Sequence, residues 1–131
     1  MSRFITSFTA AVVAASFFGF AASAWAQASG PWEAPAAEKT KKSPGGNIAN
    51  GKKLAETNCF SCHGASGKGD GPAAAALTPK PADWTSPKVQ AESEGTLFWK
   101  ISNGRGPMPP WKHLPEKERW QIVNYIRTLQ K

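Results

Sequence analysis

Cysteine, histidine and methionine are scarce in this chain of 131 residues, which has two of each. Two cysteines cannot build the multi-disulfide framework that staples many small secreted domains. A structural zinc site takes four cysteine and histidine ligands. Outside the segment 59–63 the chain offers no third cysteine and only one further histidine, His113. These shortages argue against both a disulfide scaffold and a zinc module.

Three other patterns are missing from the sequence. No run alternates apolar and polar residues as a half-buried strand would, so we expect an all-α fold. The Gly-rich stretch 64–72 lacks the Gly-Lys-Ser/Thr arrangement of a phosphate-binding loop and is expected to be an ordinary loop. No dense basic stripe is present, which disfavours nucleic acid as a partner.

The segment Cys59-Phe60-Ser61-Cys62-His63 is the most informative stretch of the chain. Two cysteines separated by two residues and followed at once by histidine form the pattern of covalent haem attachment. Each thiol can add to one haem vinyl group, and His63 then becomes the proximal iron ligand. The alternatives are half of a zinc ribbon or a dithiol redox pair, which would not need His63. The motif predicts one covalently bound haem c.

A histidine-bound haem iron needs either a sixth ligand or an open site. Once the N-terminal segment is removed, Met108 is the only methionine left, and a thioether ligand suits a haem that shuttles single electrons. Gly and Pro dominate residues 104–111, which predicts a stiff loop that presents Met108. Two alternatives remain: Met108 fills a gap in the core, or His113 is the ligand.

The first 26 residues read as an export signal. Arg3 supplies a short positive region, residues 10–22 are almost wholly apolar, and Ala24-Trp25-Ala26 is a peptidase recognition pattern, so we expect cleavage after Ala26. The alternative is a retained membrane anchor over residues 4–26, which carry no charge and are long enough to span a bilayer. Since haem is attached outside the bacterial cytoplasm, the expected location is the periplasm.

Residues 27–46 are rich in Ala, Pro, Lys and Gly and are expected to form a flexible leader. Trp32 is the only large apolar residue in this leader. It could dock on the following domain, although a loose tail is the favoured reading.

Residues 47–131 form the predicted haem domain. Apolar spacing and capping residues predict helices over about 47–57, 94–102 and 115–129, with one helical turn at 73–77 and an irregular, proline-rich stretch at 78–87. Such a small domain cannot bury a large core with its own side chains. We therefore expect a buried haem to supply much of the apolar contact and the apo-protein to be largely unfolded.

The haem motif, the downstream Gly-Pro-Met-Pro-Pro-Trp loop and the closing amphipathic helix together resemble small class I cytochromes c of bacteria. The resemblance covers residues 47–131 and implies three main helices around one haem, with His63 and Met108 as axial ligands. It also implies that the carbonyl of Pro72 accepts a hydrogen bond from His63. Gly51 of the first helix is expected to meet Tyr125 of the last.

The tryptophans Trp84, Trp99 and Trp111 are expected to wall the haem pocket, with an ordinary core role as the alternative. Trp111 could donate its indole N–H to a haem propionate. The chain departs from the family pattern where an aromatic residue is often found, which is Ala55 here. It also departs where a Ser or Thr usually caps the last helix, which is Leu114-Pro115 here.

The charge balance favours an acidic redox partner. Sixteen Lys and Arg against nine Asp and Glu give +7, which falls to +6 without Arg3 and to about +4 with two haem propionates. Lys68, Lys80, Lys100 and Lys112 are candidate steering residues. The predicted function is a periplasmic one-electron carrier rather than an enzyme, either a free monomer or the cytochrome subunit of a periplasmic oxidoreductase. The alternatives are a membrane-tethered haem module of a respiratory complex and a gas- or peroxide-reactive haem protein.

Overall fold

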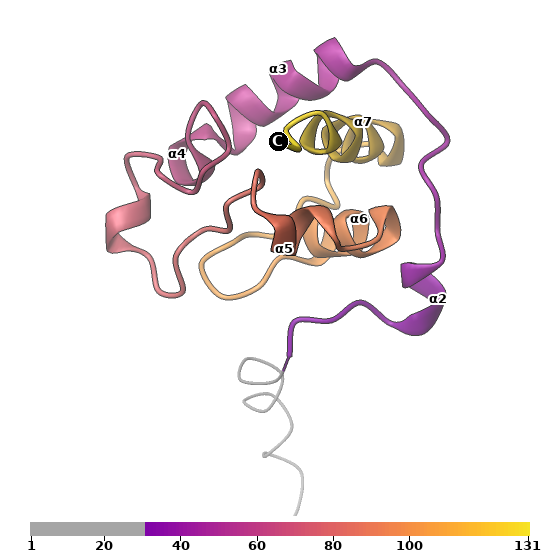
Figure 1. Cartoon of the computed structure of the whole chain (residues 1–131), viewed down its shortest axis with the longest axis horizontal. Coiled ribbons are helices and arrows are strands. Elements are labelled where there is room, and N and C mark those ends of the chain that lie inside the picture. The colour runs from indigo at the N-terminus through magenta and orange to yellow at the C-terminus, as the bar shows by residue number, and fades with distance from the viewer. Residues whose placement is uncertain (1–30) are drawn as a thin grey trace, which may run out of the picture.

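A computed structural model describes residues 31–131, and helices are the only regular elements in this range (Figure 1). In chain order they are α2 (Ala36–Lys39), α3 (Ile48–Asn58), α4 (Phe60–His63), the 3₁₀ turn η1 (Ala74–Ala76), α5 (Pro87–Gln90), α6 (Glu94–Asn103) and α7 (Glu116–Arg127). One isolated bridge joins Arg105 and Met108. The all-α prediction is confirmed. No helix within the described range is long and apolar enough to cross a membrane.

The ends of the main helices follow from their capping residues. The Asn47 side chain accepts a hydrogen bond from the backbone N–H of Asn50, so α3 begins at Ile48 as expected. Ser93 caps α6 in the same way through the N–H of Thr96. Before α7 stands Pro115, which makes no side-chain cap, and the helix begins one residue later.

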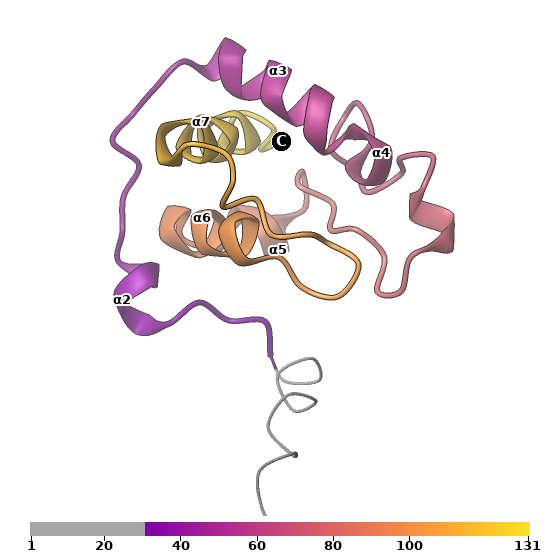
Figure 2. The same cartoon turned by 180° about the vertical axis from the view of Figure 1, so that it is seen from behind.

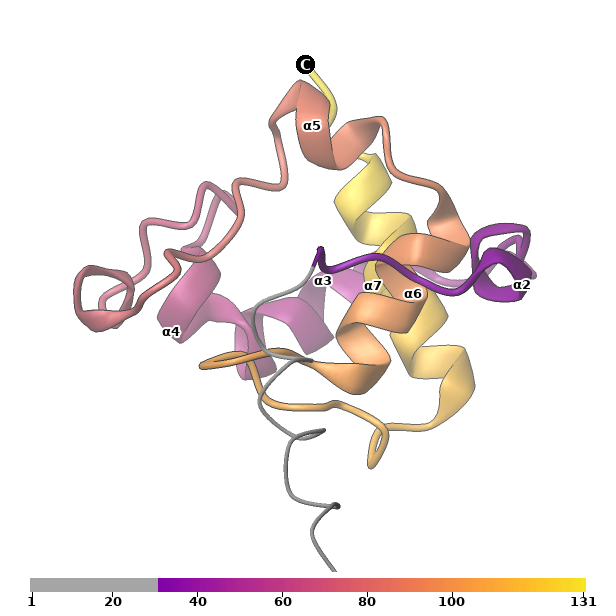
Figure 3. The same ribbon diagram turned by 90° about the horizontal axis from the view of Figure 1, so that it is seen from below.

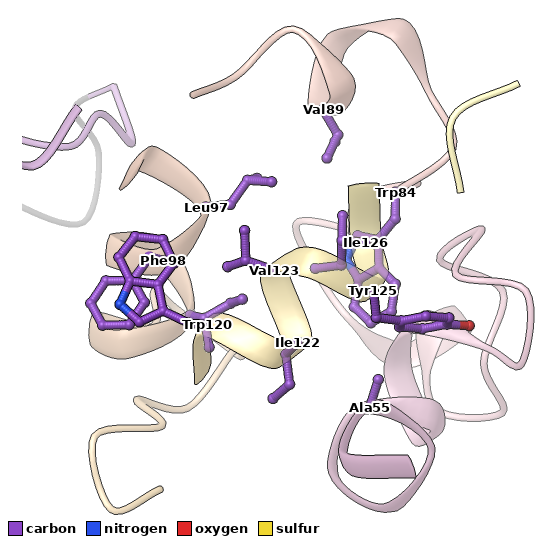
Figure 4. Close-up of a cluster of buried hydrophobic side chains, with 11 residues drawn as sticks. Ala55, Trp84, Val89, Leu97, Phe98, Trp120, Ile122, Val123, Tyr125 and Ile126 are labelled. Atoms are coloured by element: carbon purple, nitrogen blue, oxygen red, sulfur yellow. The ribbon is translucent and has the colours of Figure 1, made fainter. Parts of the chain in front are cut away.

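Helices α3 and α7 cross at a glycine. A Cβ atom added to Gly51 would lie 2.0 Å from the backbone oxygen of Gln121, so only glycine allows this approach. We expected Gly51 to meet Tyr125, but it meets the backbone of Gln121, one helical turn earlier in α7. Tyr125 instead lines a small crevice together with Ala55, and Ile48 is 47% exposed and does not fill the crossing. Figure 4 shows Ala55 and Tyr125 at the edge of the core.

The core is built where α6 packs on α7 (Figure 4). Ile122, Val123 and Ile126 of α7 are almost completely buried. The rings of Phe98 and Trp120 stack with centroids 4.0 Å apart, a contact that contributes about 1 kcal/mol beyond the buried area. This packing fixes α6 and α7 as the rigid wall beside which the functional site is built.

The leader is docked rather than loose over its described part, residues 31–46. Ala34 is buried, and a Cβ atom on Gly95 would lie 1.9 Å from the backbone oxygen of Glu38. The backbone N–H of Ser43 donates to the Glu94 carboxylate at 2.9 Å. The expectation of a flexible leader is therefore corrected for this stretch, because α2 packs against α6 (Figures 1 and 2).

Two long loops extend from the helical body on the same side, as the view from below shows (Figure 3). Loop 64–86 follows α4 and is tied back to it, since the N–H of Gly69 donates to the His63 carbonyl at 2.9 Å. Loop 104–111 follows α6 and returns to it, because the N–H of Trp111 donates to the Ile101 carbonyl at 3.1 Å. The two loops carry the residues of the candidate site.

Candidate functional site

The single turn α4 gathers the three residues of the Cys-x-x-Cys-His motif. Its N–H groups at Cys62 and His63 both donate to the Cys59 carbonyl, at 3.2 and 2.9 Å. This curl brings both thiols and the imidazole to one cavity. Both thiols are half-buried and free, and Gly64 ends the turn with φ +75°, a conformation that favours glycine.

The His63 ring is fixed by a backbone carbonyl. Its Nδ1 lies 3.0 Å from the oxygen of Ala82. Because a carbonyl can only accept, Nδ1 must carry the proton and donate, which leaves the Nε2 lone pair available to a metal. Such an outer partner sets both the tautomer and the orientation of a ligating histidine.

The expected partner of His63, Pro72, is therefore wrong. Pro72 is exposed and lies on the stretch that folds back along α4. There the N–H groups of Gly71 and Ala73 donate to the Cys62 and Ser61 carbonyls, at 3.2 and 2.8 Å. This pairing places Pro72 at the backbone of α4, and the later part of the loop reaches the imidazole instead.

Burial keeps the His63 imidazole neutral. Its ring stacks on Trp84 with centroids 4.4 Å apart and planes inclined by 23°. Desolvation lowers the pKa of His63 below its ordinary value, and the hydrogen bond to Ala82 opposes this only in part. The neutral imidazole is the form that binds a metal ion.

Met108 lies on a tight loop. The N–H of Arg105 donates to the Met108 carbonyl at 2.9 Å, and the N–H of Met108 donates back at 3.1 Å. Gly104 and Gly106 have φ values of +60° and +57°, and a Cβ atom on Gly104 would lie 2.4 Å from the Met108 oxygen. These constraints hold Met108 on a stiff loop, as the Gly- and Pro-rich sequence predicted.

Two adjoining cavities, of about 640 and 430 Å³, meet between these loops. Both are lined by Trp32, His63, Lys80, Ala82, Arg105 and Met108. The smaller cavity adds both thiols and Trp111, and the larger adds apolar side chains of α6 and α7, among them Leu97 and Ile126. The sizes are those of sites for large organic ligands.

Of the three tryptophans that were expected to wall the haem pocket, two line a cavity. Trp84 lines the larger cavity and Trp111 the smaller one. Trp99 is half-buried and lines neither cavity. On α6 the cavity is faced by Leu97, Lys100 and Ile101, at three-and-four spacing, and residue 99 falls on another side of the helix.

The competing ligand His113 does not reach the site. It is exposed, packs against the ring of Trp111 at a centroid distance of 5.3 Å, and lines neither cavity. Of the four candidate lysines, Lys68 and Lys112 are exposed and lie away from the cavities. Lys80 is exposed at the rim of both, and Lys100 is half-buried.

The residues present fit a covalently attached haem better than the alternatives. Burial, reinforced by Cys62, raises the pKa of the Cys59 thiol to about 11, whereas reactive dithiol pairs have lowered values. In the part of the chain that the structure describes, no three His, Cys, Asp or Glu side chains cluster as a metal site. Two thiols, a neutral imidazole and a thioether around a cavity match the chemistry of a haem iron site.

Sequence reasoning missed two residues of this site. Ala82 contributes only a backbone carbonyl, which every residue possesses, so no side-chain pattern could reveal it. Trp32 lines both cavities although it belongs to the leader. Its size and apolar character within a polar segment were the only sequence signal.

Comparisons with known proteins agree with this site. Residues 48–130 match the cytochrome c family model. A subunit of an Azospirillum oxidase, the cbb3-type cytochrome c oxidase subunit CcoP, is 32% identical over 97 residues, which are 68% of this chain and 31% of that subunit. The chain thus spans about a third of the length of this curated relative.

Two solved structures share the fold. One is from a reducing HAO-like protein complex of Kuenenia stuttgartiensis, with a TM-score of 0.57 and 32% identity over 64% of this chain and 44% of that chain. The other, the KustC0563 c-type cytochrome, has a TM-score of 0.52 and 27% identity over 62% of this chain and 98% of its own length.

Proposed function

This chain belongs to the cytochrome c family, and from that premise we propose that it is a periplasmic carrier of single electrons. It has one cysteine pair for one covalent haem c, which supplies a one-electron iron couple. The carrier acts either free or as the cytochrome subunit of a periplasmic oxidoreductase. The observation that carries the proposal is that His63 and Met108 line the same two cavities.

Each site residue has a distinct proposed role. Cys59 and Cys62 would hold the haem through thioether bonds, and His63 Nε2 and the Met108 sulfur would bind its iron. Trp84 backs the imidazole and Trp111 covers the thiol side of the haem. These roles are supported by the lining of the cavities and by the stacking of His63 on Trp84.

Rigid ligand positions suit electron transfer. The hydrogen bond from His63 to Ala82 holds the imidazole, and the paired backbone bonds of the Met108 loop hold the main chain of Met108 in place. Two retained ligands would leave little to rearrange between the oxidation states and would leave no open site for gases or peroxide. Exposed Lys80 at the rim of the cavities would steer an acidic partner toward the site.

The c-type cytochromes are exported proteins, and the segment predicted to direct export here, residues 1–26, lies outside the described residues. Within the proposal, the signal peptide comprises residues 1–26, the leader 27–46 and the haem domain 47–131. Mass spectrometry of the purified protein should give the mass of residues 27–131 plus one haem. The mass of an intact N-terminus would instead support the membrane-tethered alternative.

A role as a subunit has its own support. The relative in Azospirillum is named as an oxidase subunit, and one structural neighbour belongs to a protein complex. Affinity purification from the native host under mild conditions separates the two forms of the proposal. A stable complex in fixed proportion indicates a subunit, and a monomeric haem protein indicates a free carrier.

The substitution Met108→Ala tests the ligand assignment. The oxidised wild-type protein should show the optical band of thioether–iron ligation at neutral pH, and the variant should lose it. The potential should fall by a large part of the roughly 0.8 V range that axial ligands span. The variant should also bind carbon monoxide when reduced.

The matched control is His113→Ala, which removes the other candidate ligand and should leave spectrum and potential unchanged. If Met108→Ala altered neither property, the assignment of Met108 would be wrong. A ferrous wild-type protein that binds carbon monoxide readily would favour the reactive-haem alternative.

A further inference from the structure

Trp32 has a buried polar atom that the protein itself does not satisfy. Its indole Nε1 is buried and makes no hydrogen bond to any residue in the described range. Buried N–H groups in folded proteins nearly always have an acceptor, and an unpaired one is destabilising. Because Trp32 lines both cavities of the haem site, the missing acceptor is expected in the bound group.

The position of Trp32 is built into the fold. Residues 31–43, which we call the strap, are fixed along α6 by the buried side chain of Ala34 and by the hydrogen bond from Ser43 to Glu94. The close approach of the Glu38 carbonyl to Gly95 leaves no room for a side chain between them. Trp32 lies on a segment held by these three contacts and therefore belongs to the folded body.

Lys100 reinforces this placement from α6. Its Nζ lies 5.0 Å from the centroid of the Trp32 ring, within the range of a cation–π interaction. The same ammonium group pairs with the Glu92 carboxylate, so it is held in a defined position beside the ring. The indole is therefore packed against a positively charged group that lines the larger cavity.

The position of the thiols identifies which part of the haem lies near this end. A haem linked through its vinyl groups to Cys59 and Cys62 turns its two carboxylates away from the thiols. The thiols line only the smaller cavity, whereas Lys88 and Lys100 line only the larger one. The larger cavity has mixed charge, since Glu33, Asp83 and Glu92 line it beside the lysines, so its position away from the thiols is what places the haem carboxylates there.

We propose that the strap completes the haem site and that the Trp32 indole N–H donates a hydrogen bond to a haem propionate. Trp32 takes this role in place of Trp111, which lines only the cavity on the thiol side. Trp32 is a positioning residue: it fixes the carboxylate edge and shields that edge from water. The inference rests on the bound haem and not on the carrier role.

The substitution Trp32→Phe removes the N–H and keeps an aromatic ring. In the resonance Raman spectrum of the holoprotein, the propionate bending band should move in this variant. The control Trp99→Phe alters a half-buried tryptophan that lines neither cavity and should leave the band in place. An unmoved band in Trp32→Phe, or an equal movement in the control, would overturn the proposal.

A measurement on the unmutated holoprotein guards against a variant that fails to mature. In the ferrous protein labelled with ¹⁵N-tryptophan, the Trp32 indole signal is assigned through its contacts with Lys100. Its proton should exchange with solvent at least about tenfold more slowly than that of Trp99, as a hydrogen bond to a charged acceptor implies. Equal exchange rates would contradict the hydrogen bond.

The strap itself is tested by Gly95→Ala, which pushes against the Glu38 carbonyl without entering the cavity. The Raman band should move in the same direction as in Trp32→Phe. An unchanged band would contradict the proposal that docking of the strap positions Trp32. All three measurements report on the haem carboxylate. A protein in which Met108 does not bind the iron could still give the expected results in these three measurements. The proposed electron-carrier function and the proposed Trp32 hydrogen bond can therefore fail independently.

Discussion

At the scale of single residues, the hydrogen bond from His63 to Ala82 decides what the imidazole can do. A donating Nδ1 commits Nε2 to the role of a ligand, and stacking on Trp84 holds the ring in the required plane. Neither contact depends on the titration of an acidic or basic partner. The orientation of the proposed proximal ligand is therefore set by backbone and aromatic packing alone.

Asp83, next to Ala82, anchors the same end of loop 64–86. Its Oδ1 accepts from the N–H and the hydroxyl of Thr85, at 2.8 and 2.7 Å. These hydrogen bonds lower the pKa of Asp83 below its ordinary value of 3.8. The folded state therefore binds fewer protons than the unfolded state in acid. This contribution to stability is complete above pH 3.8 and is lost as the pH falls through the lowered pKa.

The substitution Asp83→Asn keeps an acceptor and removes this titration. The melting temperature of the wild-type holoprotein should exceed that of the variant near neutral pH, and the difference should shrink below pH 3.8. Differential scanning calorimetry between pH 2 and 7 checks this. A difference that stayed constant with pH would show that the hydrogen bonds to Thr85 do not favour the charged carboxylate.

Residues with distinctive side chains could be predicted from the sequence. Cys59, Cys62, His63 and Met108 were found because their chemistry is rare in this chain, and all four line the smaller cavity. Ala82 could not be found, because the interaction uses a carbonyl that every residue has. The contribution of Trp32 depends on a tertiary contact of the leader, which no local pattern encodes.

At the scale of elements, capping and spacing located the three main helices to within a few residues. The short helices α2 and α5 were not predicted, because four residues carry too little periodicity to recognise. Two errors concern the direction that a residue faces on its helix. Gly51 meets the turn before Tyr125, and Trp99 faces away from the cavity, since small rotations about a helix axis are invisible in the sequence.

The crossing of α3 and α7 is the element contact most sensitive to substitution. In Gly51→Ala the new Cβ atom would lie 2.0 Å from a backbone oxygen that cannot move alone. The helices must separate, which should cost about 3 kcal/mol and lower the melting temperature by more than about 10 °C.

Thermal unfolding followed by circular dichroism measures this loss. The control Lys53→Ala, at an exposed position of α3, should change stability by no more than about 0.5 kcal/mol. A Gly51→Ala variant as stable as the control would mean that the two helices can separate freely at this point.

At the scale of the whole molecule, the candidate haem site is lined by segments from most parts of the fold. Residues from the strap, α4, both long loops, α6 and α7 line the two cavities. The hydrophobic core of the polypeptide itself lies chiefly along α6 and α7. The bound haem is thus expected to hold together segments that otherwise contact each other little.

Removal of the attachment chemistry tests this dependence. The double variant Cys59→Ser/Cys62→Ser, prepared without haem, should lose most of its helical ellipticity and melt without a cooperative transition. The substitution Ser61→Ala, within the same turn, keeps the attachment and should preserve both. A cooperative, helical apo-protein would show that the polypeptide supplies its own core.

The sequence indicated this global architecture well because the covalent motif and the closing helix define it. It did not indicate that the leader belongs to the folded body. Low complexity and charge in residues 27–46 favour disorder on local grounds, and the structure overrides them through contacts with α6. Docking of this kind is decided by surfaces that form only after the helices have packed.

The strap also implies an order of maturation. It precedes the Cys-x-x-Cys-His motif in the chain, but its anchors lie after the motif, with Ser43 bonded to Glu94 across 51 positions. A chain exported from its N-terminus first exposes the thiols before residue 94 has emerged. The thiols are then accessible for haem ligation while the strap has nowhere to dock. The order of the chain therefore allows haem attachment to precede docking of the strap.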